Sequence, residues 1–90
     1  MTTYYVASFH SVSQALRFEK LLQEKAIPVK MIPVPRLLSS SCGIAARFEA
    51  DDYPKVASLL AAGGENAYEV YLFTSDGKNV QAERVWKANA

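Results

Sequence analysis

The sequence predicts an α+β fold in which strands and helices follow one another in the order β-α-β-β-α-β. Two segments with apolar residues at helical spacing alternate with short runs rich in aromatic and β-branched residues. That order, with two helices over one face of an antiparallel sheet, is typical of the ferredoxin-like sandwich. The expected strands are residues 4–9, 29–33, 44–48 and 67–73. We expect one domain at 1–75 and a C-terminal extension at 76–90.

The first helix is expected to begin at Ser11, because Gln14 follows three residues later in a capping-box pattern. Its apolar stripe consists of Ala15, Phe18, Leu21 and Leu22. Pro28 is expected to end it, since the residue before a proline avoids the helical conformation.

The second helix is expected to be capped by Asp51 or Asp52, with Pro54 in its first turn, where proline is tolerated. Its apolar stripe consists of Val56, Leu59 and Leu60. The pair Gly63-Gly64 is a stop signal. In the strand that follows, alternation places Tyr68, Val70 and Leu72 on one side.

The C-terminal extension has two interpretations. Asp76-Gly77 is a hairpin signal, and a strand after it would place Val80, Ala82, Arg84 and Trp86 on one face. The same segment contains good helix formers, and Glu83 and Lys87 have the spacing of a helical ion pair. We favour the helix and leave the extra strand open.

Composition excludes several classes of function. The net charge of +1 argues against a nucleic-acid binder, which needs a basic surplus to neutralise phosphates. No apolar run is long enough to cross a membrane, and the N-terminus does not resemble a signal peptide. The single cysteine fits a reducing compartment. We therefore expect a cytoplasmic protein that binds neither nucleic acid nor membrane.

The candidate site surrounds the only cysteine, Cys42, which follows Ser39, Ser40 and Ser41 and precedes Gly43. Arg36 and Arg47 flank this stretch. Gly43 is expected to have a positive φ, which would let the loop turn from Cys42 directly into the next strand. Cations and converging backbone N–H groups favour the thiolate, which is the reactive form of cysteine. We therefore expect Cys42 to be the reacting group and the other six residues to form a binding site for an anion. The alternative is that Cys42 is a small, partly buried apolar residue and that the arginines are ordinary surface residues.

Other chemistries have less support in the sequence. His10 could act as a base for Cys42, because both are expected at the same edge of the sheet, but a surface histidine beside a helix cap is the simpler interpretation. One cysteine and one histidine cannot complete a tetrahedral metal site, so we expect no metal. Nothing in the sequence calls for a cofactor.

The motif Val-Pro-Arg-x-x-Ser-Ser-Ser-Cys-Gly-x-Ala-Ala-Arg-Phe at 34–48 resembles the signature of a family of small bacterial proteins, the selenium/sulfur carrier protein-like family. The helical segment at 15–22 and the Ile-Pro-Val run at 27–29 are also similar, so the resemblance covers residues 4–62. The chain departs from the family pattern at Ala26, where glycine is expected, and at Ala46, where leucine is frequent.

The resemblance implies that Cys42 holds sulfur or selenium as a persulfide or selenosulfide and passes it to a partner. Donor and acceptor proteins would then be the partners, and the protein would be a carrier or accessory rather than a turnover enzyme. The alternative is a regulatory or ligand-binding module whose loop captures a small anion without thiol chemistry. A structural domain, including a homodimer, is the third hypothesis.

Overall fold

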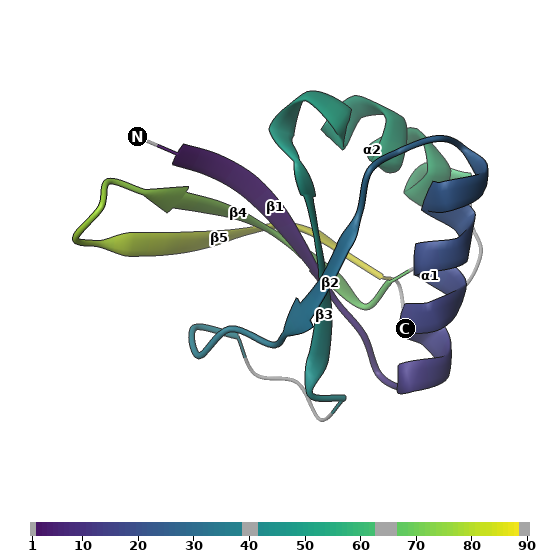
Figure 1. Ribbon diagram of the computed structural model, residues 1–90, viewed down its shortest axis with the longest axis horizontal. Helices are drawn as coiled ribbons and strands as arrows, with labels where there is room; N and C mark the ends of the chain where they lie inside the picture. Colours follow the sequence, from purple (N-terminus) through teal and green to yellow (C-terminus); the bar gives the residue numbers. More distant parts are fainter. Residues whose placement is uncertain (1, 39–41, 63–66, 89–90) are drawn as a thin grey trace.

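The computed structural model describes residues 2–38, 42–62 and 67–88 and contains one five-stranded antiparallel sheet with two α-helices. The elements in chain order are β1 (Thr2–Ser8), α1 (Val12–Glu24), β2 (Lys30–Pro33), β3 (Ile44–Glu49), the 3-10 turn η1 (Ala50–Asp52), α2 (Tyr53–Ala61), β4 (Glu69–Ser75) and β5 (Val80–Lys87). The strand order in the sheet is β2-β3-β1-β4-β5. Both helices lie on one side of this sheet (Figure 1). The predicted α+β class is therefore confirmed.

Helix α1 begins where the capping pattern predicts. The Ser11 hydroxyl accepts a hydrogen bond from the Gln14 backbone N–H at 3.2 Å. The Gln14 side chain reaches back and accepts from the His10 backbone N–H at 2.7 Å. The two contacts satisfy N–H groups that a helix N-terminus otherwise leaves without partners.

The end of α1 is a Schellman motif rather than a direct effect of Pro28. The Ile27 N–H donates to the Leu22 carbonyl at 2.8 Å, and the Ala26 N–H donates to the Gln23 carbonyl at 3.1 Å. This geometry places Ala26 at φ 58°, a left-handed conformation that normally favours glycine. The departure from the family pattern at Ala26 therefore falls where the backbone most favours glycine.

Helix α2 begins differently from the prediction. Asp52 precedes it, but its side chain makes no capping hydrogen bond. The reason is that η1 runs directly into α2, so Asp52 has a φ of −91° and a ψ of −6° instead of the extended backbone of a capping residue. Pro54 lies in the first turn, as expected. The predicted stop at Gly63-Gly64 lies outside the described residues.

Apolar side chains lie on both faces of the sheet. The larger cluster joins the two helices to the helix-facing side of β1, β3 and β4 and includes Phe18, Phe48, Val56 and Val70. A second cluster contains Val6, Leu38, Ala45 and Phe73. Because side chains alternate along strands, Val6 and Ala45 face away from Ala7 and Ala46, which belong to the larger cluster. The second cluster therefore lies on the face that the helices leave uncovered.

The helix that we favoured for the C-terminal extension is wrong, because this segment is strand β5. Val80–Lys87 pairs with β4 across a hairpin whose turn has Gly77 at φ 95°. The Asp76 carboxylate accepts from the N–H groups of Lys78 and Asn79 and stabilises that turn. Pairing with β4 also lets Val85 and Trp86 pack against the main core. Long-range pairing and burial thus outweigh the local helix propensity.

Candidate functional site

The candidate site is the loop that joins β2 to β3. Its two ends are held together by a hydrogen bond from the Val34 N–H to the Gly43 carbonyl, at 3.1 Å. A turn inside the loop is closed by the Leu38 N–H and the Pro35 carbonyl, at 3.0 Å. Ser8 of β1 pairs with Ala45 of β3, so the loop leaves the sheet at the end where β1 finishes and α1 begins (Figure 1).

Gly43 has the conformation that the sequence predicts. Its φ is 79°, and a Cβ built on it would meet no atom within 4 Å. The requirement for glycine therefore comes from the backbone dihedral angle and not from lack of space. Gly43 lets the chain turn from the loop into β3 immediately after Cys42.

Cys42 is partly buried and packs against the helix-side core cluster. Ile44, two residues later, packs against the same cluster. The site cysteine is thus neither fully exposed on the loop nor sealed in the core. A half-buried thiol at the end of a sheet can be held in one place and still be reached by a reagent or a partner.

Leu38 is a site residue that sequence reasoning missed. It is only 7 % exposed and packs on the uncovered sheet face with Val6, Ala45 and Phe73. Its neighbour Leu37 is 56 % exposed. Leu38 therefore fastens the loop to one face of the sheet, while Cys42 contacts the core on the other face. The signal in the sequence is an apolar pair inside an otherwise polar loop.

The structure does not bring the two predicted arginines together at Cys42. Arg36 lies exposed in the turn of the loop. Arg47 lies three residues beyond Ile44, about 10 Å further along β3 at the usual strand rise. Its guanidinium carbon lies 3.9 Å from the centre of the Tyr4 ring, on the uncovered face. The three serines, Ser39 to Ser41, lie outside the described residues.

Arg47 also lines an open hollow of about 340 Å³ between β2 and β3. Its wall includes Lys30, which is the direct cross-strand neighbour of Arg47, and Glu49. This hollow is at the end of β3 remote from Cys42. Any anion bound there would be distinct from one at the loop.

His10 lies at the same end of the sheet as Cys42, as expected from the topology. It is exposed, and its ring packs against Tyr68 with centroids 4.0 Å apart. Its backbone N–H takes part in the cap of α1. These contacts favour the simpler interpretation, a surface histidine beside a helix cap.

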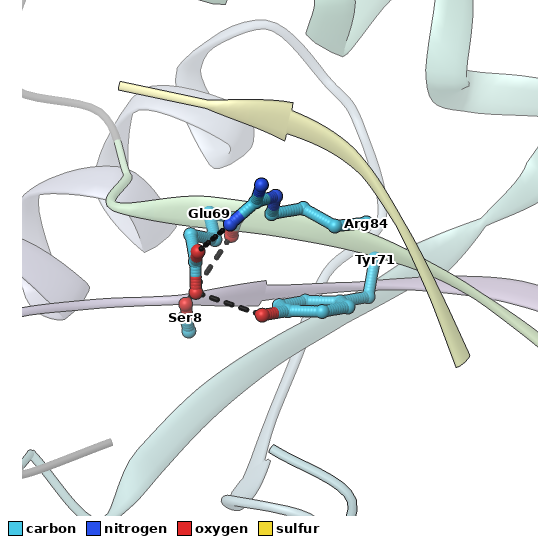
Figure 2. A network of polar contacts seen from close by, with 4 residues as sticks. All are labelled: Ser8, Glu69, Tyr71 and Arg84. Atoms are coloured by element: carbon cyan, nitrogen blue, oxygen red, sulfur yellow. Dashed lines mark hydrogen bonds and ion pairs between the residues drawn. The ribbon is translucent and has the colours of Figure 1, made fainter. Parts of the chain in front are cut away.

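A polar network on the uncovered face was not anticipated from the sequence (Figure 2). The Glu69 carboxylate accepts from the Tyr71 hydroxyl at 2.8 Å and from the Arg84 guanidinium at 3.0 Å. The Glu69 side chain is 9 % exposed and that of Arg84 is 52 % exposed. The buried Ser8 hydroxyl donates to the Glu69 carbonyl at 3.4 Å. The network thus joins β1, β4 and β5 near the end of the sheet that holds the loop.

The network influences the titration of Tyr71. Burial raises the pKa of the Tyr71 phenol above its usual 10.0, and the hydrogen bond to the Glu69 carboxylate raises it further. Arg84 acts in the opposite direction. Arg84 reaches Glu69 only because β5 is a strand paired with β4. The network could therefore not be predicted while the extension was expected to be a helix.

Among the described residues, no group of three histidine, cysteine, aspartate or glutamate side chains is placed to hold a metal ion. In the same part of the chain, no helix is both long enough and apolar enough to span a bilayer.

Fold and site together define a small α+β domain that presents a single cysteine in a loop at the end of its sheet. The chain belongs to the family described as "Putative Se/S carrier protein-like", whose model matches residues 4–72. The match extends from β1 into β4, ten residues beyond the resemblance expected at 4–62, and ends before β5. No curated protein and no solved structure matched the chain.

Proposed function

We propose that the protein carries a sulfur or selenium atom on Cys42, as a persulfide or selenosulfide, and passes it to a partner protein. The observation that carries this proposal is membership of the carrier-like family through a match that includes Cys42, the only cysteine in the chain. With no second cysteine to resolve it, a sulfur atom held there leaves only by reaction with another molecule.

The transfer needs no external oxidant or reductant. The Cys42 thiolate attacks the outer sulfur of a donor persulfide, a new S–S bond forms, the old S–S bond breaks and the donor thiolate leaves. In the second step an acceptor thiolate attacks the outer sulfur on Cys42, and the Cys42 thiolate is the leaving group. Selenium in place of the outer sulfur follows the same sequence. The protein is therefore a carrier and returns to its starting state after each cycle.

The geometry of the loop suits this role. Partial burial against the core fixes the position of Cys42, and Gly43 allows the sharp turn beside it. We assign the exposed Arg36 and the backbone around Gly43 to stabilisation of the anionic sulfur, and Ser39, Ser40 and Ser41 to hydrogen bonds with it. Arg47 is better explained by its contact with Tyr4.

Two finer assignments belong to the same proposal. The strand order β2-β3-β1-β4 and the positions of α1 and α2 support classification as a ferredoxin-like sandwich, extended by β5. A reducing compartment such as the cytoplasm would keep a lone thiol available for exchange.

The test is the intact mass of protein isolated without reductant from cells supplied with sulfide or selenite. We expect a gain of one sulfur or selenium atom that dithiothreitol removes and that Cys42→Ser abolishes. Cys42→Ala provides a second control for the size of the side chain. A homogeneous protein of unmodified mass under both supplies would contradict the carrier function.

A further inference from the structure

Most of the exposed large apolar side chains in the described part of the chain belong to the end of the sheet that holds Cys42. In the described part of the chain, four large apolar residues are exposed: Val12, Leu16, Leu37 and Val80. Val80 begins β5 beside the 76–79 turn, at the end of β4 remote from the loop. The other three belong to the first turns of α1 and to the loop that contains Cys42. Scattered apolar residues on a surface are ordinary, but three at the end of the sheet that holds a candidate reacting residue call for an explanation.

Val12 and Leu16 lie on the helix side of Cys42. They are four residues apart, so they lie on the same side of α1, one turn above the other. Each is 52 % exposed, whereas Ala15 and Phe18 on the adjacent side of the helix are buried. Helix α1 packs on β3, and its first turn lies at the end of the sheet where β3 starts (Figure 1). The first turns of α1, which carry these two side chains, therefore lie at the same end of the sheet as the segment that leads from Cys42 into β3.

Leu37 belongs to the loop that leads to Cys42, in the turn at 35–38. The turn at 35–38 lies on the side of the sheet away from the helices, with the start of β3 between this turn and α1 (Figure 1). Leu38 is anchored in the second apolar cluster, which leaves Leu37 pointing to solvent at 56 % exposure. Anchoring Leu38 thus presents Leu37 at a fixed position.

The charges of this end are mainly positive. Arg17 and Lys20 are exposed on α1, and Arg36 is exposed in the loop. The acidic residues of α1 and of the described loop residues 34–38 are the half-buried Glu19 and the exposed Glu24, which lies at the far end of α1. An apolar patch with a cationic border fits a partner surface with apolar residues bordered by carboxylates.

We infer that Val12, Leu16 and Leu37 form a docking surface for an acidic partner protein that exchanges sulfur or selenium with Cys42. This inference rests on the proposed carrier function. The surface places apolar contacts at the end of the sheet that holds the thiol, so a partner that covers it brings its own sulfur to Cys42.

The inference can be tested with peptides whose cysteine is activated as a mixed disulfide with thionitrobenzoate. The Cys42 thiolate attacks the peptide sulfur, the S–S bond of the reagent breaks and coloured thionitrobenzoate leaves, which gives the rate directly. The probes are Glu-Leu-Cys-Leu-Glu, its polar twin Glu-Ser-Cys-Ser-Glu and its basic twin Lys-Leu-Cys-Leu-Lys. Each rate is compared between the wild-type protein and a variant with Val12→Ser, Leu16→Ser and Leu37→Ser, so the intrinsic reactivity of each peptide cancels.

We expect the triple variant to react about tenfold more slowly with the acidic apolar peptide, since burial of one leucine side chain is worth at least that factor. The polar twin and the small reagent iodoacetamide should react equally with both proteins. Val80→Ser is the matched control and should leave every rate unchanged. If the triple variant does not fold, Leu16→Ser alone should slow the acidic apolar peptide several-fold.

Equal slowing of all three peptides, or none, would overturn the docking surface. A dimer in sedimentation that Leu16→Ser dissociates would also overturn it, because a second copy would then be the occupant. Failure of the carrier function is separate, because it is read from the mass of the isolated protein and not from peptide selectivity.

Discussion

The guanidinium carbon of Arg47 lies 3.9 Å from the centre of the Tyr4 ring, a cation–π contact between neighbouring strands β3 and β1. On the same face Tyr4 also stacks against Phe73. The next residue of β1, Tyr5, stacks against Phe48 and Tyr53 on the helix face. Arg47 therefore packs over aromatic side chains on the sheet face opposite the helices. Its position explains why an arginine close to Cys42 in sequence need not act on the thiol.

Arg47→Ala should lower the free energy of unfolding by about 0.5–1 kcal/mol through loss of the cation–π contact, with little change in the alkylation rate of Cys42. Arg36→Ala should slow the alkylation of Cys42 and change the free energy of unfolding by less than about 0.5 kcal/mol, since Arg36 is exposed and lies in the site loop. Urea unfolding and iodoacetamide kinetics on the two variants measure both quantities. If both substitutions slowed alkylation equally, Arg47 would also act on the reactivity of Cys42, which would contradict this prediction.

Substitutions at Leu38 and at its neighbour Leu37 test whether Leu38 anchors the loop. Leu38→Ala should cost about 2–3 kcal/mol, because it removes a side chain buried against Val6, Ala45 and Phe73. Leu37→Ala should stay within about 0.5 kcal/mol, because Leu37 is exposed. Urea unfolding separates them, and similar losses of stability from both substitutions would contradict the anchor.

Gly43→Ala should destabilise the protein by about 1–2 kcal/mol, because the left-handed conformation is unfavourable for a residue with a Cβ. It should also slow alkylation of Cys42, since the turn beside the thiol would relax. Gly43→Val should have the larger effect on both. Gly77→Ala is the control: its φ is 95° in the distant hairpin, so it should lower stability without altering the alkylation rate.

Ala26→Gly should raise the free energy of unfolding by about 0.5–1 kcal/mol, because Ala26 holds a φ of 58° with an exposed side chain. The control is Ala62→Gly at the end of α2, where φ is −69° and glycine offers no such relief. Thermal and urea unfolding of the two variants should give changes of opposite sign. A loss of stability from Ala26→Gly would contradict the Schellman motif.

Stability should decrease in alkaline solution as Tyr71 ionises. Burial and the hydrogen bond to Glu69 raise its pKa above the usual 10.0, so the folded state retains a proton that the unfolded state loses. The contribution is complete below pH 10.0 and is lost as the pH rises through the folded-state value. Tyr71→Phe should therefore show a shallower loss of stability in urea titrations as the pH is raised above 10.0. Identical pH profiles of the wild-type protein and Tyr71→Phe would exclude this role. Burial also raises the pKa of Tyr5, but Tyr5 is present in both proteins and contributes equally to both profiles.

The features that the sequence predicted correctly depend on residues close to one another in the chain. The cap at Ser11 and Gln14, the proline in the first turn of α2 and the positive φ of Gly43 are each decided within a few residues. Hydrophobic periodicity, which is also local, was enough for the element order through β4. The likeness to a family came from the motif at 34–48, and the match over residues 4–72 then established it.

Only the tertiary structure decided which face each residue meets and what it contacts there. Residues 80–87 have helix propensity, yet pairing with β4 makes them a strand and brings Arg84 to Glu69. Strand alternation and strand length carry Arg47 to Tyr4, away from the loop, and the second apolar cluster holds Leu38. These contacts join residues distant in sequence, and their free energy comes from burial and pairing that exist only after the sheet has formed. Local sequence therefore placed the cysteine in its loop, and the assembled sheet determined what surrounds it.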